Sequence, residues 1–186
     1  MARMTYHHGD LRHALEQAAL ELVAERGPQG FTMAEASRRA GVSVAAPFRH
    51  FANKDALLAA LALRSYEEQR DRFAAALAGT DDPVEQLARF AAAYVRFAVE
   101  EPALFDVTFS AGLVKSDHDG LEEAGQQVLA VLRAPAEQLG GGLRLIHTIA
   151  ATGHGFAAFL REGVLTDVEA AATEAAAAAR TLASAR

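Results

Sequence analysis

The sequence contains no cysteine, has only 5 prolines and lacks any long run of apolar residues. Without cysteine the chain cannot form disulfide bonds, thiolate metal sites, iron–sulfur clusters or a cysteine nucleophile. No apolar run approaches the roughly 18 residues that a membrane span requires, and residues 1–10 lack the basic and apolar regions of an export signal. We therefore expect a cytoplasmic protein with no membrane partner.

Alanine dominates what is present. It accounts for 44 of the 186 residues, and it is the best helix former and a poor strand former. Apolar residues make up 51% of the chain and charged residues 23%, which is ordinary for a globular protein and excludes a disordered or fibrous chain. Because no segment alternates like a strand, the sequence predicts an all-α fold.

Charge is distributed unevenly along the chain. The net charge of -6 combines +1 over residues 1–55 with -7 over residues 56–186. Residues 36–54 contain four cations and no acid. A cationic stretch on an acidic protein indicates an anionic partner, although a solvated helix face would carry the same pattern. The four cations are Arg38, Arg39, Arg49 and Lys54.

A helix-turn-helix is predicted near the N-terminus, after a first helix that Gly27-Pro28 ends. Thr32 and Glu35 form a capping box, so a helix should begin at residue 33 and end near residue 40, before a glycine-bearing turn. A short second helix is expected over residues 43–51. Its first turn should be distorted, because Pro47 crowds the carbonyl four residues earlier.

The remainder of the sequence predicts a second, larger helical region. Asn53 can cap a long helix that reaches residue 78 and joins the two halves, and Asp82-Pro83 gives a strong start to the next. We expect two domains, residues 1–55 and residues 56–186. The further helices are expected over residues 102–109, 121–133, 143–161 and 168–184, with a polar loop over residues 111–120.

The string TMAEASRRAGVSVAAPFRHFANKDALL, residues 32–58, resembles the DNA-binding motif of TetR-type transcriptional regulators. The resemblance rests on the capped helix, the G-V-S turn, the aromatic-x-H-F pattern of residues 48–51 and the N-K-D start of the next helix. The opening string Tyr6 to Arg12 and the residues Ala45-Ala46-Pro47 look like one branch of the family. Close similarity covers about residues 5–63.

This resemblance implies a three-helix DNA-binding domain followed by a helical effector-binding and dimerisation domain. The expected protein is a homodimeric, ligand-responsive regulator, more specifically a repressor that a small molecule releases from a double-stranded DNA operator. No enzyme activity and no cofactor are expected. The alternative from another class is a helical module that binds a protein or a membrane surface through its cationic face.

The recognition helix of such a motif enters the major groove with its N-terminal residues facing base edges. Residues 44–46 are small and apolar, so they would contact thymine methyl groups, and base reading would fall partly on the arginines at 38, 39 and 49. The resemblance implies phosphate-facing positions at residues 32, 48, 50 and 54, with phenylalanine at 48 where the family usually has tyrosine. The candidate DNA-binding residues are Thr32, Arg38, Ser43, Val44, Ala45, Ala46, Phe48, Arg49, His50 and Lys54.

Aromatic residues in the body could line an effector pocket or form an ordinary core. Residues 150–155 resemble a Trp-x-x-x-His-Gly string of one TetR branch, with alanine at the tryptophan position. The resemblance favours the pocket, because TetR-type regulators usually bind an effector in this region. The candidate effector residues are Phe90, Tyr94, Phe97, Phe105, Phe109, His154 and Phe156.

Catalytic and metal-binding patterns are missing. The sequence has no H-E-x-x-H or E-x-x-H string and none of the common nucleophile or phosphate-loop motifs. We therefore expect no catalytic residues and no metal site. The histidines at 147 and 154 are interpreted as interior side chains.

The predicted helix over residues 143–161 has two non-polar faces, one with Ile146 and Ile149 and one with Ala151 and Ala158. A helix that is apolar on two sides is packed on both. With the alanine-rich last helix it could form the four-helix dimer interface typical of the family. A monomer in which both faces pack internally is the alternative.

Overall fold

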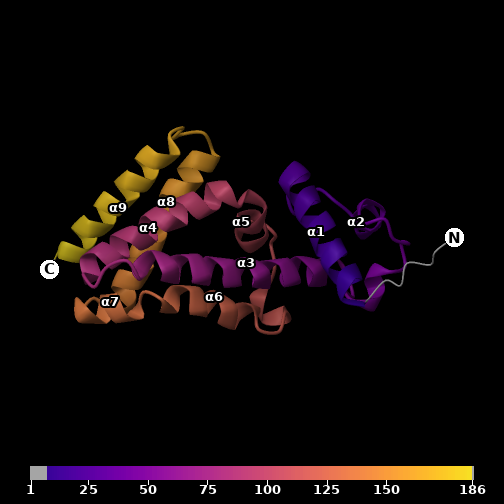
Figure 1. The fold of residues 1–186 in the computed structure, drawn as a ribbon, viewed down its shortest axis with the longest axis horizontal. Coiled ribbons are helices and arrows are strands. Elements are labelled where there is room, and N and C mark those ends of the chain that lie inside the picture. Colours follow the sequence, from indigo (N-terminus) through magenta and orange to yellow (C-terminus); the bar gives the residue numbers. More distant parts are fainter. Residues whose placement is uncertain (1–7, 186) are drawn as a thin grey trace. The chain divides into compact units, whose positions relative to one another are not determined.

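The computed structural model describes residues 8–185, with side chains from residue 11 onward, so Tyr6 and His7 of the opening string lie outside it. All regular structure in this range is helical, in agreement with the predicted all-α fold (Figure 1). Two short 3-10 turns occur at residues 47–49 and 115–117. The α-helices are α1 His8–Arg26, α2 Met33–Arg39, α3 Lys54–Leu77, α4 Pro83–Glu100, α5 Pro102–Phe109, α6 Leu121–Ala130, α7 Arg133–Gln138, α8 Gly142–Arg161 and α9 Val168–Ser184.

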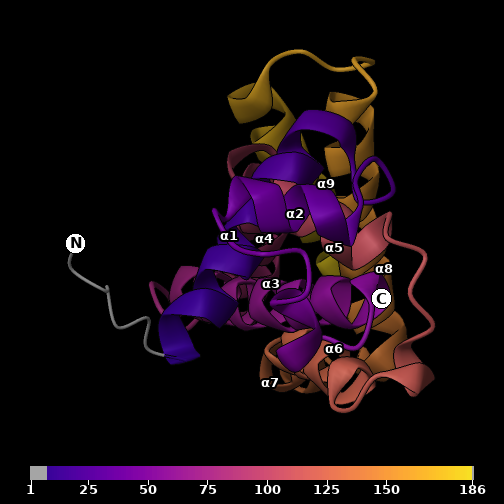
Figure 2. The ribbon, with the colours of Figure 1, turned by 90° about the vertical axis from the view of Figure 1, so that its right-hand side faces the viewer.

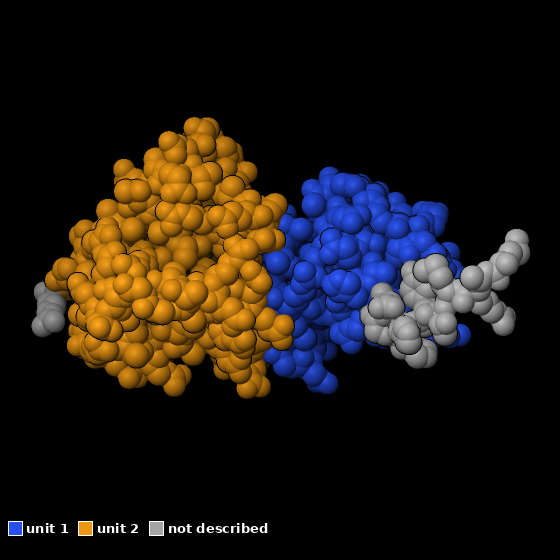
Figure 3. All heavy atoms as spheres, in the orientation of Figure 1, with its two compact units in different colours: residues 1–65, 103–121 blue, residues 66–102, 122–186 orange. Residues whose placement is uncertain are grey.

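Contacts divide the chain into two compact units (Figure 3). Unit 1 comprises Met1–Ser65 and Ala103–Leu121, and unit 2 comprises Tyr66–Pro102 and Glu122–Arg186. The long helix α3 contributes its first half to unit 1 and its second half to unit 2.

Unit 1 is built on α1, α2 and the first half of α3. Most large apolar side chains of α1 and of the first half of α3 are buried, as are Phe31 before α2 and Phe51 before α3. Gly27 and Gly41 follow α1 and α2 with φ of 74° and 70°, the left-handed conformation that glycine adopts without steric cost. Phe51 belongs to the core of this unit, since only 3% of it is exposed.

The N-terminus of α2 carries the predicted capping box. The Glu35 backbone N–H donates to Thr32 Oγ1 at 3.3 Å, and the Thr32 backbone N–H donates to Glu35 Oε2 at 2.8 Å. Arg26 donates to the other Glu35 oxygen at 2.9 Å. The bonds that the Glu35 carboxylate accepts, chiefly from Arg26 and then from the hydroxyl and the N–H of Thr32, lower the pKa of Glu35 to about 2. The box therefore joins the end of α1 to the start of α2.

The segment after the glycine turn differs from the expected helix over residues 43–51. Ala46 N–H donates to the Ser43 carbonyl at 3.0 Å, and a 3-10 turn then covers only Pro47–Arg49. His50 and Phe51 both donate to the Pro47 carbonyl at 2.9 Å. Because Pro47 has no N–H and its ring opposes the carbonyl of Ser43, a regular α-helix cannot form across it. The expected distortion thus extends over the whole segment.

The rest of unit 1 consists of α5 and the following loop. Ser65 Oγ, at the middle of α3, donates to the Leu104 carbonyl at 2.9 Å and lies 2.8 Å from the Thr108 hydroxyl. Gln29 Nε2 donates to the Ala111 carbonyl at 2.7 Å, which ties the α1–α2 connection to the end of α5. These bonds explain why α5 clusters with the N-terminal helices rather than with α4.

Unit 2 has α4, α8 and α9 in mutual contact, with α7 against α4 and α8 (Figures 1 and 2). The expected helix start at Asp82 is confirmed, since Asp82 accepts from Val84 N–H at 2.9 Å. Asp167 caps α9 by accepting from Ala170 N–H at 3.0 Å. A row of alanines on α9, including Ala172 and Ala175, is buried and allows α9 to approach α4 closely.

One predicted helix is divided in two. Residues 121–133 were expected to form a single helix, but α6 ends at Ala130 and α7 begins at Arg133. The physical reason is Pro135, whose ring would clash with the carbonyl of Val131 in a continuous helix.

Candidate functional site

The helix-turn-helix presents a small exposed face. Ser43, Val44, Ala45, Phe48 and Arg49 are exposed, whereas Pro47 is buried and anchors the segment. Thr32 and Arg38 are also exposed, and Ala46, His50 and Lys54 are half-buried. The candidate DNA-binding residues therefore all belong to unit 1. Residues 43–49, which we call the recognition segment, contain most of the exposed candidates.

The arginines around this face fall into two groups. Arg39 binds both Glu25 oxygens and lies 3.7 Å from Glu21, so its charge is matched by α1. Its hydrogen bond to Glu25 and the attraction of both carboxylates raise its pKa. Arg38 and Arg49 have no carboxylate within ion-pair distance in the part of the chain that the structure describes. Of the three arginines considered for base reading, Arg38 and Arg49 are thus the available ones.

Two further candidates are more constrained. Lys54 Nζ lies 4.7 Å from the centre of the Phe31 ring, and partial burial lowers the pKa of this amine. His50 Nε2 is buried and meets no hydrogen-bond partner among the described residues. A phosphate contact by His50 would need its other ring nitrogen or a shift of the ring.

Phe48 is the most unusual side chain of the recognition segment. It is 55% exposed and Val44 is 52% exposed, although both are apolar. Both side chains therefore leave much of their apolar surface in solvent. The helix-turn-helix thus exposes apolar side chains as well as the unmatched arginines.

In unit 2 the predicted aromatic residues of α4 form a packed cluster. The Phe73 ring centre lies 4.8 Å from that of Phe90, 5.5 Å from that of Tyr94 and 6.1 Å from that of Phe97. These are ordinary packing distances for aromatic pairs. Phe73, on α3, is the centre of this cluster and was not among the candidates, although its helical spacing with Leu77 marked it as a buried position.

A polar pair adjoins the aromatic cluster. Tyr94 Oη lies 3.0 Å from His154 Nδ1, so one of the two groups donates to the other. Burial raises the pKa of Tyr94, and burial lowers the pKa of His154. Gly153 permits the contact, because a Cβ at this position would lie 3.1 Å from Tyr94 Cβ. His154 thus places an imidazole against a buried phenol.

The remaining effector candidates are distributed between the units. Phe105 and Phe109 lie on α5 in unit 1, where their ring centres are 4.7 Å apart. Phe105 is buried and Phe109 is exposed, and Phe156 on α8 in unit 2 is half-buried. The five candidates of unit 2 are Phe90, Tyr94, Phe97, His154 and Phe156.

The prediction that His147 is an interior side chain is wrong. This side chain is exposed on α8, and only His154 is partly buried. Among residues 8–185 no group of three or more His, Asp or Glu side chains could hold a metal ion. The described helices include none that is both long and apolar enough to cross a membrane.

The second face of α8 is uncovered. His147 and Ala151 are exposed, and large apolar side chains at both ends of α8 and near the end of α9 reach solvent. The alternative, in which both faces pack within one chain, is therefore not met in the described residues. The large apolar side chains are Leu143, Phe159 and Leu182.

Comparisons with known proteins agree with this architecture. The model of the family "Bacterial regulatory proteins, tetR family" matches residues 16–61, and that of the "Tetracyclin repressor-like, C-terminal domain" matches residues 87–184. No curated protein sequence matches the chain significantly.

Solved structures with the same fold cover almost the whole chain. A protein of unknown function from Rhodococcus sp. RHA1 is 27% identical, with a TM-score of 0.81 over 96% of this chain and 98% of that one. A tetR-family regulatory protein from Rhodococcus RHA1 is 16% identical, with a TM-score of 0.77 and coverages of 95% and 98%. The regulator FadR from Bacillus subtilis, solved with stearoyl-CoA, is 16% identical, with a TM-score of 0.73 and coverages of 91% and 97%. With family matches over the helix-turn-helix and over more than half of the chain in the C-terminal region, the protein belongs to the TetR family of DNA-binding transcription regulators.

Proposed function

We propose that the protein is a homodimeric repressor that binds an operator through the recognition segment and leaves it when a small molecule binds the helical body. In this proposal residues 1–55 form the DNA-binding domain and residues 56–186 the effector-binding and dimerisation domain. The observation that carries it is the exposed recognition segment beside two unmatched arginines, Arg38 and Arg49.

The DNA contacts divide into two kinds. Thr32, Lys54 and Phe48 border the face and would set the register of the protein on the sugar-phosphate backbone. Residues 43–46 and Arg49 would meet base edges in the major groove. Most of the salt-dependent affinity would then come from the phosphate contacts.

A second copy of the chain is the proposed occupant of the uncovered α8 face. The small residues Ala151 and Ala158 allow close helix approach, and Leu143 and Phe159 would lose their exposure in a four-helix arrangement with α9. A dimer would also place two recognition segments one DNA turn, about 34 Å, apart.

The proposed effector region lies around the Tyr94–His154 pair in unit 2. The pair supplies a phenol and an imidazole beside aromatic rings, which is the mixture of few polar groups and many apolar ones that small-molecule sites use. The FadR regulator, which has a similar fold and was solved in complex with stearoyl-CoA, supports a small-molecule ligand for this kind of protein. Ligand binding would open the cluster and shift the population toward a form with weak DNA affinity.

The test is fluorescence anisotropy with a duplex from the region upstream of the protein's own coding sequence. A scrambled duplex of the same composition is the control, and both are titrated over a salt series. We expect tighter binding to the native duplex by about 10³-fold, with affinity falling steeply as salt rises.

Equal, weak affinity for both duplexes would contradict recognition of that region. No binding at low salt by a folded dimer would contradict the DNA-binding function itself. Sedimentation velocity gives the oligomeric state, and a screen for thermal stabilisation by metabolites addresses the effector, since a ligand at 100 times its Kd stabilises by about 2.7 kcal/mol.

A further inference from the structure

The recognition segment is poor in groups that can read bases by hydrogen bonds. Residues 41–50 contain no asparagine, glutamine, lysine or carboxylate. Adenine is read best by the side-chain amides of asparagine and glutamine, and the cytosine amino group by carboxylates. Within the segment only Ser43 and Arg49 are both polar and exposed. Hydrogen bonding can therefore specify few base pairs of a half-site.

The same segment is rich in exposed methyl and ring carbons. In the described part of unit 1 the exposed large apolar side chains are Val44, Phe48, Phe109 and Val114, and the first two lie within five residues of each other. Ala45 beside them is exposed as well. Exposed apolar side chains gathered at one place indicate a surface that becomes covered by a partner.

Charge identifies the partner as an anionic polymer. No acid occurs over residues 36–54, and Glu35 and Glu25 on the N-terminal side of this stretch are already matched to Arg26 and Arg39, while Asp55 follows Lys54 directly. Arg38 and Arg49 remain unmatched within the described chain and precede and follow the exposed apolar residues along the sequence. Apolar side chains together with unmatched cations fit the major groove, where thymine is the base with a methyl group.

We infer that this protein specifies its operator mainly through the C5-methyl groups of thymine, which Val44 and Ala45 contact, with Arg49 as the main hydrogen-bonding reader. The inference rests on the proposed operator binding and names the chemistry that the operator must present. Phe48 packs against the sugar-phosphate backbone beside these contacts.

The experiment deletes the methyl groups from the DNA and from the protein. The probe is the tightest duplex recovered by the full-length protein from a random duplex pool. It is synthesised in two forms, one with thymine and one with deoxyuridine at every thymine position. Deoxyuridine keeps all hydrogen bonds and removes only the methyl groups, and burial of one methyl-sized group is worth about fourfold in affinity.

We expect the deoxyuridine duplex to bind wild-type protein on the order of tenfold more weakly, with an unchanged salt slope because phosphate contacts are kept. The variant V44A should lose affinity for the thymine duplex and lose much less for the deoxyuridine duplex. V114A, which alters an equally exposed valine outside the recognition segment, is the matched control and should bind both duplexes like the wild type. All three proteins are compared by circular dichroism to establish equal folding.

Equal Kd values of the wild type for the two duplexes would overturn the inference and leave operator binding intact. So would an equal loss by V44A on both duplexes, because the valine would then act without the methyl groups. If the random pool yields no enriched sequence and all duplexes bind alike, operator binding itself fails, and the inference fails with it.

Discussion

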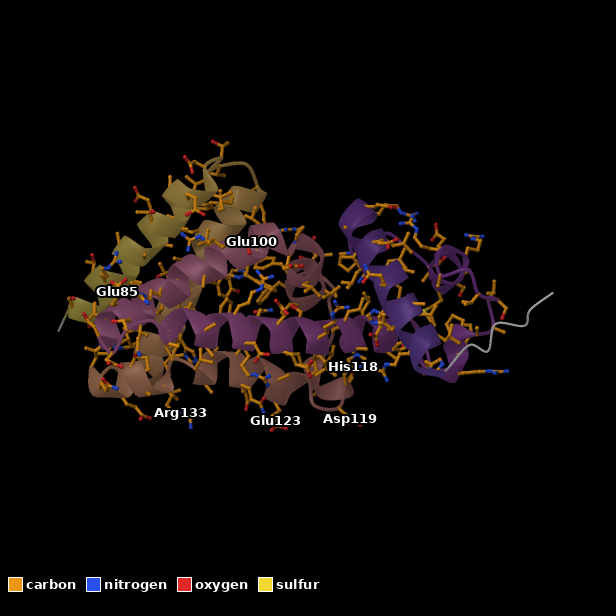
Figure 4. All side chains as sticks on the ribbon, in the orientation of Figure 1. Glu85, Glu100, His118, Asp119, Glu123 and Arg133 are labelled. Carbon is orange, nitrogen blue, oxygen red and sulfur yellow. The ribbon has the colours of Figure 1, made fainter. Side chains whose placement is uncertain are left out.

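Unit 2 and the recognition segment of unit 1 differ in how their charged and apolar side chains are placed. In unit 2 the arginines hold helices together: Arg72 binds Glu68, Glu100 and Glu101, and Arg96 and Arg180 bind Glu169 and Glu85. Glu85 and Glu100 lie at the two ends of α4 (Figure 4), so these pairs secure the helix along its length. The recognition segment of unit 1 instead exposes an unmatched arginine and two large apolar groups.

The difference between paired and unpaired arginines distinguishes surface that stabilises the fold from surface that can bind a partner. A charge matched inside the protein is screened and fixed, whereas an unmatched charge on a small rigid face is available to a partner. The aromatic cluster around Phe73 in unit 2 buries its rings against one another, whereas Phe48 in unit 1 and Phe159 in unit 2 are exposed. Departures from self-contained packing therefore occur at the recognition segment and on the exposed side of α8.

The largest expected effect tests the contrast between the arginines. R49A should weaken specific DNA binding by about 5- to 150-fold, since a base-reading arginine contributes about 1–3 kcal/mol. R96A, which removes an ion pair within unit 2, should leave DNA affinity unchanged and lower stability by at most about 1 kcal/mol. Anisotropy and thermal unfolding measure the two quantities. Unchanged affinity and sequence preference in R49A would remove this arginine from the site.

The next effect concerns close packing in unit 2. G153A should destabilise the protein by about 1–2 kcal/mol, because the new methyl group would lie only 3.1 Å from Tyr94 Cβ in a packed cluster. G155A, two residues along α8, meets no atom within 4 Å and should be neutral or stabilising. Urea unfolding of both variants checks this, and equal stabilities would show that α8 adjusts freely.

A smaller effect, an increase in DNA affinity, is expected from adding a hydroxyl group to the exposed ring of Phe48. F48Y restores the hydroxyl that the family usually has at this position, and a new phosphate hydrogen bond should tighten DNA binding about fivefold. F109Y adds a hydroxyl to another exposed phenylalanine of the same unit and serves as the control. Tightening by both variants, or by neither, in the anisotropy titration would contradict a phosphate contact at residue 48.

The smallest effect is a dependence of stability on pH that arises in unit 2. Because burial lowers the pKa of His154 below its ordinary 6.5, the folded state binds a proton less readily than the unfolded chain. The free energy of unfolding should thus decrease as pH falls below about 6.5 toward the pKa of His154 in the folded state. The effect is measured above the pH range in which carboxylates titrate. H154Q should flatten this dependence, and H147Q, on the exposed face of α8, should keep it. Urea unfolding at several pH values provides the measurement.

The capping signals were readable in the sequence because they are local. Thr32 with Glu35, Asp82 and Asp167 each act within three residues, and all three form the expected bonds. Asn53 likewise accepts from Ala56 N–H at 2.8 Å, one residue before α3 begins. Short-range hydrogen bonds depend little on the rest of the fold, so their patterns predict helix starts reliably.

Features that depend on distant partners were not readable. The pairing of Arg39 with Glu25 joins residues fourteen apart on different helices, and the exposure of His147 depends on which face of α8 meets α4 and α9. The effects of Pro47 and Pro135 were local, yet the extent of the distortion at Pro47 was underestimated and the helix break before Pro135 was not predicted. In both cases the missing N–H and the ring clash shortened a helix, which periodicity alone does not reveal.

The buried proline of the recognition segment also affects the thermodynamics of binding. A three-residue 3-10 turn has few backbone hydrogen bonds to hold it, but Pro47 fixes its own φ and its carbonyl accepts from both His50 and Phe51. The conformational entropy of the segment is thereby lost during folding rather than at the moment of DNA contact. A reading element that is already ordered binds with a smaller entropic penalty, so this proline preorganises the operator complex from within the free protein.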